Sequence, residues 1–122
     1  MAEQSILVSI REKCVGNTHD RTFDEELLFF INSAFNNLTQ IGVGPTTGFR
    51  VNGENEKWVD FLGTSALLEQ VKEYVYLRVR VLFDPPASST VLEQLNKEIA
   101  EREWRINITV DDQTGGGSTC TI

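Results

Sequence analysis

The sequence predicts a mainly α-helical protein, a small bundle of about four helices with a short β-hairpin or loop protruding from it and an extended C-terminal arm. Apolar residues recur at three-to-four spacing in most of the chain, which is the period of a helix. Glycine and proline gather between these segments. The helical period is then lost near the C-terminus. We therefore expect a helical body over residues 1–107 and an arm over residues 108–122.

The first two helices are predicted from their starts and their apolar faces. Residues 3–14 place Ile6, Leu7 and Ile10 on one side, and Gly16 suits a helix C-terminus that needs positive φ. Thr22-x-x-Glu25 matches a capping box and predicts the start of the second helix. An apolar stripe follows it at helical spacing: Leu27, Ile31, Ala34, Leu38 and Ile41.

The glycine-rich segment after the second helix predicts a turn. Asn52-Gly53 lies between "FRV" and "ENEKW", and this dipeptide favours a type I′ turn because both of its positions need positive φ. We therefore expect a short β-hairpin at about residues 47–58. The following "WVDFLG" returns Trp58 and Phe61 to an apolar surface, and we predict that both belong to the core.

The segment "EYVYLRVRVLFDPP", residues 73–86, supports two interpretations. Its alternation of β-branched and polar residues is typical of a strand. However, residues 64–83 run without a turn residue, which is far longer than an average strand. On a helix, one face would carry Leu68, Val71, Val75, Val79 and Leu82, and Asp84-Pro85-Pro86 would end it. We favour a central helix that is covered on most sides.

The last helix is predicted to begin with a second capping box, Thr90-x-x-Glu93. Leu92, Leu95, Ile99 and Ile106 keep one face apolar, and Trp104 lies on a second ridge. Trp104 is predicted to be core like Trp58 and Phe61, and the alternative is that one of these three anchors a neighbouring subunit. From Asn107 the period is lost and three glycines follow. This arm is either a frayed tail or a strand that orders on binding.

Composition excludes several classes of function. A net charge of −7 disfavours a protein that binds nucleic acid through its phosphates. His19 is the only histidine, so no histidine-based metal set or activated Ser or Cys nucleophile can form. The glycine-rich "GVGPTTG" lacks the Gly-Lys-Ser/Thr ending of a phosphate loop. We therefore expect no enzyme, no metal, no cofactor and no membrane span.

Several motifs together resemble the phage head–tail connector family, also called adaptor or head-completion proteins. They are "FINSAFNNLTQIGVGPTTGF", then "WVDFLG", then "VKEYVYLRVRVLFDPPASSTVLEQLNKEIAEREWRINI". The most distinctive part is "LFDPP" followed closely by "EWRIN". The resemblance covers about residues 5–108 and implies a small helical bundle with a protruding loop, in which the matched segment at residues 73–83 is helical.

The resemblance also implies a role and partners. Members form a ring, commonly twelve-fold, beneath the portal of the filled capsid, where they extend the DNA channel. The expected partners are the portal protein, other copies of the chain and a stopper or tail-completion protein, while double-stranded DNA passes through without specific binding. The expected location is the virion neck, after synthesis in the bacterial host cytoplasm. The alternative is a small helical phage DNA-packaging or regulatory module that binds nucleic acid, which the acidic charge disfavours.

Three sets of residues are hypothesised to make contacts in such a ring. The carboxylates of Glu54, Glu56 and Asp60 would face the channel, where negative charge repels the DNA backbone. Arg78, Arg80 and Arg102 would form ion pairs between subunits, with solvated side chains as the alternative. Contacts to the portal or to a neighbour are assigned to Trp104, Arg105, Ile108, Val110 and Ile122.

Overall fold

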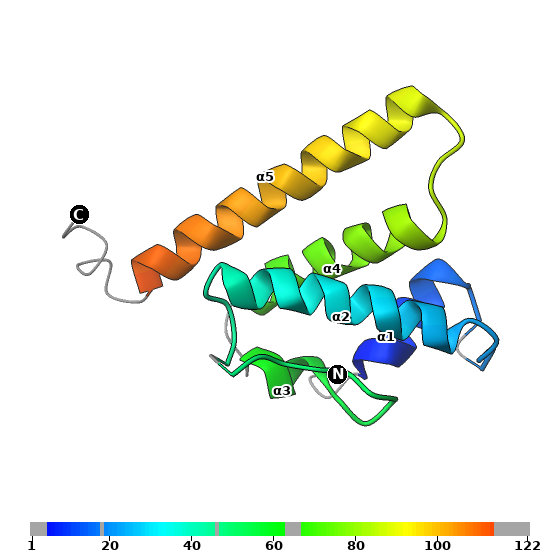
Figure 1. Ribbon diagram of the computed structural model, residues 1–122, viewed down its shortest axis with the longest axis horizontal. Helices are drawn as coiled ribbons and strands as arrows, with labels where there is room; N and C mark the ends of the chain where they lie inside the picture. The colour runs from blue at the N-terminus through cyan, green and yellow to red at the C-terminus, as the bar shows by residue number, and fades with distance from the viewer. Residues whose placement is uncertain (1–4, 18, 46, 63–66, 114–122) are drawn as a thin grey trace.

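The computed structural model describes four ranges of the chain, residues 5–17, 19–45, 47–62 and 67–113 (Figure 1). Within them lie five helices and no strand. The helices are α1 (Ile6–Cys14), α2 (Asp24–Gln40), α3 (Trp58–Leu62), α4 (Leu67–Phe83) and α5 (Ser89–Gln113). The predicted fold class, a small helical bundle, is therefore confirmed.

Helix α4 lies at the centre of the bundle because it contacts each of the other four helices. In Figure 1, α2 packs along one side of α4, α1 and α3 lie below, and α5 runs across the top. The helical interpretation of this segment is confirmed and the strand interpretation is wrong. The buried positions follow the period of a helix: Leu67, Leu68, Val71, Tyr74, Val75 and Val79.

The helices begin at different residues from those the capping boxes predicted. Phe23 is the N-cap of α2 and its side chain makes no capping bond, so the Thr22 box is wrong. The Thr22 amide instead donates to Asp20 Oδ1 at 3.0 Å, which makes it part of the preceding turn. At α5 the cap is Ser88, whose Oγ accepts from the Val91 amide at 3.3 Å.

Residues 47–58 do not form the predicted hairpin. Neither Asn52 nor Gly53 has the positive φ that a type I′ turn requires. Among the described residues, the only isolated bridge joins Ser5 to Lys57, and the Ile6 amide donates to the Glu56 carbonyl at 3.0 Å. The segment is a loop held on the bundle by contacts with distant residues, which a two-residue turn signal does not report.

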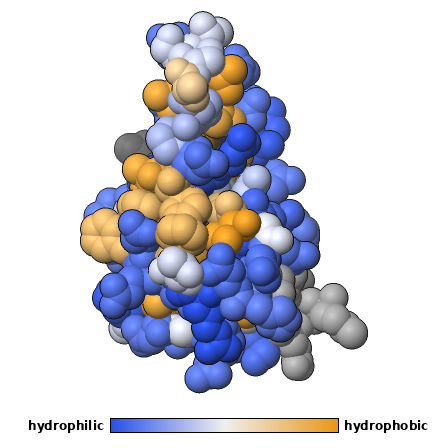
Figure 2. All heavy atoms as spheres, turned by 90° about the vertical axis from the view of Figure 1, so that its right-hand side faces the viewer, coloured by the Kyte–Doolittle hydropathy of each residue, from blue (hydrophilic) through white to orange (hydrophobic). Residues whose placement is uncertain are grey.

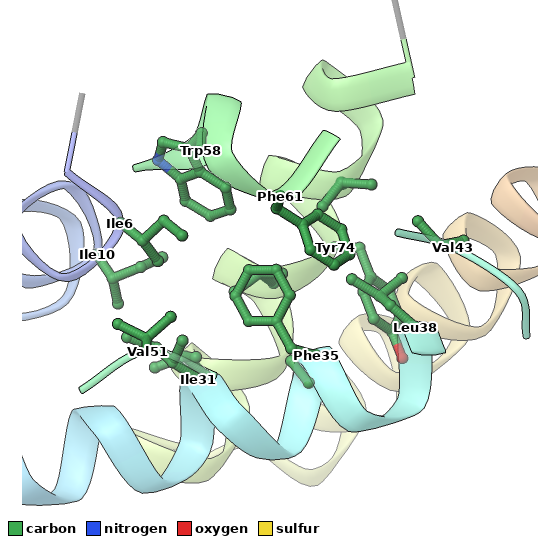
Figure 3. Close-up of a cluster of buried hydrophobic side chains, with 14 of the residues drawn as sticks. Ile6, Ile10, Ile31, Phe35, Leu38, Val43, Val51, Trp58, Phe61 and Tyr74 are labelled. Carbon is green, nitrogen blue, oxygen red and sulfur yellow. The ribbon is translucent and has the colours of Figure 1, made fainter. Parts of the chain in front are cut away.

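The core joins all five helices and the loop between α2 and α3, with Ile99 and Ile106 as the contribution of α5. Figure 3 shows part of it. Its centre is Phe35, whose ring centroid lies 4.6 Å from that of Phe61, 5.3 Å from Phe49 and 6.1 Å from Trp58. The Trp58 indole Nε1 donates to Ser9 Oγ at 2.9 Å, which satisfies its one polar atom. Trp58 and Phe61 are buried, as predicted.

Helix α5 differs from its prediction in two ways. Trp104 is 62% exposed, so its assignment to the core is wrong. The helix also continues through residues 108–113, where an extended arm was predicted. No glycine or proline interrupts the chain in this stretch. The side chains of residues 110–113, Val110 among them, and the whole of residues 114–122, including Ile122, lie outside the described residues.

Candidate interaction surfaces

The described part of the chain offers protein surfaces rather than a chemical site. Burial raises the pKa of the Cys14 thiol to about 11, so the thiol is protonated at neutral pH and is a weak nucleophile. No group of three or more metal-binding side chains occurs among the described residues. None of the helices in these described residues could span a lipid bilayer.

Helix α5 packs against α4 with the side that carries the buried Ile99 and Ile106. The first surface is the other side of α5, which faces outward. Trp104 and Ile108 lie four residues apart on this outward side and are 62% and 40% exposed. Beside them, Arg105 Nη2 lies 2.8 Å from Glu101 Oε2. We call Glu101, Trp104, Arg105 and Ile108 the α5 ridge. The ridge contains three of the five residues predicted to contact the portal or a neighbour.

A second surface is a hollow of about 530 Å³ between α2 and the loop that follows it. Asn32 fixes its floor, because its Nδ2 donates to the Val51 carbonyl at 2.9 Å and its Oδ1 accepts from the Val51 amide at 2.7 Å. Phe29 lies in its wall and is 72% exposed. Glu25 and Arg50 also line it, and neither forms an ion pair among the described residues. We call it the α2–loop hollow.

Sequence reasoning missed this hollow. Its two walls are far apart in the chain and are joined by the Asn32–Val51 hydrogen bonds. One signal was available, because Phe29 falls outside the apolar stripe of α2 and an exposed phenylalanine there has no role in the core.

A third surface lies at the end of the bundle where α4 meets the start of α2. The rings of Phe23 and Phe83 are 5.3 Å apart in an edge-to-face arrangement. Phe23 and Leu82 are 36% and 46% exposed. Figure 2 shows apolar side chains gathered on this side of the molecule. We call Phe23, Leu82 and Phe83 the end patch.

The three carboxylates predicted to face a channel each have a role in the fold. Glu54 Oε2 lies 2.8 Å from Arg11 Nη2, and this hydrogen bond is the main reason that the pKa of Glu54 is lowered. Glu56 Oε1 accepts from the Gly53 amide at 3.2 Å, which holds a turn of the loop. Asp60 Oδ2 accepts from the Lys57 amide at 2.9 Å at the start of α3. Channel lining by these residues stays a prediction.

Sequence reasoning also missed Arg11, which is 1% exposed and connects three parts of the chain. Its Nε and Nη2 donate to the two Asp24 carboxylate oxygens at 3.1 and 2.7 Å, and Nη2 also reaches Glu54. Burial would lower the pKa of Arg11, but the hydrogen bonds to Asp24 and Glu54 outweigh it and raise that pKa. The guanidinium thus joins α1 to the start of α2 and to the loop.

The three arginines predicted to form ion pairs between subunits lie in different environments. Arg102 pairs within the chain, with Glu73 at 3.2 Å and Glu98 at 3.5 Å, and so links α5 to α4. Arg78 is half-buried, with its guanidinium carbon 5.8 Å from the centroid of the Tyr74 ring. Arg80 is exposed in the last turn of α4. The intersubunit role of all three stays a prediction.

Comparison with known proteins gives one match. A family model described as phage connector protein matches residues 6–113. The match therefore includes all five helices, the α5 ridge and the α2–loop hollow. No curated protein and no solved structure matches the chain.

Proposed function

The chain belongs to the phage connector protein family, and on this premise we propose that it is one subunit of a ring, twelve-fold in symmetry, that docks beneath the portal. Family membership makes its role structural, joining phage head and tail components in the virion neck. The ring would extend the DNA channel of the portal and present a platform to a stopper or tail-completion protein.

One observation carries this proposal, the family match across residues 6–113. Surface chemistry supports it. A closed ring of identical subunits needs two different contact surfaces on each chain, because every copy meets one neighbour on each side. The described part of the chain offers two separate candidates for these contacts, the α5 ridge and the α2–loop hollow.

For DNA to pass through such a ring, the channel wall must not bind it. A charge of −7 on each subunit opposes phosphate binding, so we propose that DNA passes without specific contact. Channel lining by Glu54, Glu56 and Asp60 is part of this proposal. Glu56→Gln and Asp60→Asn together remove two charges but keep both hydrogen-bond acceptors. Phage assembled with this variant should eject DNA more slowly, and an unchanged ejection rate would contradict the lining role.

The ring is tested by negative-stain electron microscopy of the purified chain, alone and mixed with the portal protein of the same genome. We expect rings that cap the portal and whose symmetry can be counted in end views. A monomer that leaves the portal bare would contradict the proposal. A gel shift of duplex DNA that weakens with salt would instead support the alternative of a nucleic-acid-binding module.

A further inference from the structure

We propose that neighbouring subunits meet by seating the α5 ridge of one copy in the α2–loop hollow of the next. This inference rests on the proposed ring and names its contact. It assigns Trp104 as the anchor, Phe29 as part of the wall that receives it, and two pairs of opposite charges beside them.

The ridge has the character of an interface anchor. Only one side of α5 is covered, since α4 is its main contact in the described chain. Trp104 is 62% exposed, which is unfavourable in water for so large an apolar side chain, and tryptophan is among the residue types enriched at the energetic centres of protein interfaces. Ile108 lies one turn further along the same side and widens the apolar area.

The hollow is suited to receive such an anchor. Its volume of about 530 Å³ exceeds that of an indole ring, and it is fixed by the buried Asn32–Val51 hydrogen bonds instead of by a loose loop. Phe29 offers an exposed ring in its wall for an edge-to-face contact with an incoming indole. Phe29 and Trp104 are the two most exposed aromatic side chains of the described residues, and seating Trp104 here would remove both from water.

Charge favours a second copy of this chain as the occupant. The hollow carries Glu25 and Arg50 without ion-pair partners among the described residues, and the ridge carries Glu101 and Arg105, which pair with each other at 2.8 Å beside Trp104. Each surface therefore carries one acidic and one basic side chain, and in the proposed contact Arg50 meets Glu101 and Glu25 meets Arg105. Because each copy carries −7, association of copies needs such local pairs to offset the general repulsion.

The positions of the two surfaces allow the contact to repeat. In Figure 1, α5 forms the upper edge of the molecule, and the loop between α2 and α3 lies on the other side of the bundle. A ridge that binds a hollow on the far side of an identical copy leaves that copy's ridge free for the next one. Such a head-to-tail contact generates a ring when the rotation closes.

Photo-crosslinking tests the contact directly. Benzoylphenylalanine replaces Trp104, and equal amounts of natural and ¹⁵N-labelled protein are mixed, irradiated and digested for mass spectrometry. We expect crosslinks of mixed isotopic composition from position 104 to residues 25–36 or 50–52. The same substitution at Val91, which is 46% exposed on the same helix but off the ridge, should give no such crosslink.

Electron microscopy of the same samples separates the two proposals. Rings whose position-104 crosslinks map elsewhere, for example to the end patch or to added portal protein, would overturn this contact and leave the ring in place. Rings without any position-104 crosslink would have the same meaning. A sample without rings, with or without portal protein, and without mixed crosslinks would overturn both.

Variants give an independent measurement. Trp104→Ala and Phe29→Ala should each weaken assembly at least about tenfold in mass photometry, as truncation of an interface anchor does. Val91→Ala is the matched control and should leave assembly unchanged. Arg50→Glu should weaken assembly, and Glu101→Arg in the same chain should recover part of it because the pair is restored with its signs exchanged. Recovery would not follow from a role of Arg50 in folding, and its absence would contradict the charge pairing.

Discussion

Replacing Arg11 with methionine is expected to destabilise the fold by about 3 kcal/mol, even though methionine retains an unbranched apolar side chain. Removing one partner of a buried ion pair typically costs about 3–5 kcal/mol. The Asp24 and Glu54 carboxylates would lose their shared cation. Their side chains are 23% and 35% exposed and regain some hydration, which places the cost at the lower end of that range.

Urea unfolding followed by circular dichroism measures this effect, with Arg21→Met as the matched control. Arg21 also pairs with Glu54, at 3.5 Å, but its side chain is 71% exposed. Such an exposed pair contributes little, so the control should stay within about 0.5 kcal/mol of the natural protein. Adding Asp24→Asn and Glu54→Gln to Arg11→Met should restore part of the lost stability, because the unpaired charges are then removed. Equal stabilities of the two arginine variants would contradict the role assigned to Arg11.

The difference between Arg11→Met and the natural protein should also depend on pH. The hydrogen bond from Arg11 lowers the pKa of Glu54 in the folded chain. A lowered folded-state pKa gives stability that is fully present above the unfolded-state pKa and is lost as the pH falls through the folded-state pKa. The natural protein should therefore lose this contribution in acid. The difference in unfolding free energy between the two proteins should become smaller as the pH falls below the ordinary pKa of a glutamate.

The course of the bundle could be predicted from the sequence because the positions of its apolar side chains repeat with the period of a helix. For α4, the length of the uninterrupted segment and the proline stop at Pro85 outweighed the strand-like alternation. Both features can be read from the sequence of that one segment. The loop could not be predicted in the same way. Asn52-Gly53 favours a hairpin locally, but Asn32 binds Val51 and Arg11 binds Glu54 from distant parts of the chain. These contacts determine the path of the loop.

Only part of the candidate surfaces could be predicted from the sequence, for the same reason that the loop could not: contacts between distant segments are not visible in a local pattern. Trp104 and Ile108 were named as contact residues from the resemblance, and their exposure on one side of α5 agrees with availability for such a contact. The prediction that Trp104 is core failed because α4 is the main contact of α5 among the described residues, and Trp104 lies on the side of α5 that faces away from α4. The hollow depends on two segments meeting in space, and a pattern along a single segment does not contain that information.

The largest effect on stability is expected for Phe35→Ala, at about 4 kcal/mol, within the range for deleting a buried phenylalanine ring. Phe35 is fully buried, and the rings of Phe49, Trp58 and Phe61 surround it. These neighbours belong to the loop and to α3, while Phe35 itself belongs to α2. Its removal would therefore leave a cavity where the loop and α3 are attached to α2, and the surrounding rings cannot all move to fill it.

The same helix supplies the matched control, because Phe29→Ala deletes an identical ring that is 72% exposed. At concentrations where the chain is monomeric, this control should stay within about 0.5 kcal/mol of the natural protein. Both substitutions are made in a Trp104→Phe background, so that fluorescence reports Trp58 alone during urea unfolding. Phe35→Ala should shift the midpoint far to lower urea with little change in slope, since a cavity alters stability more than the surface exposed on unfolding. Similar midpoints for the two variants would mean that Phe35 does not fasten the loop and α3 to the bundle.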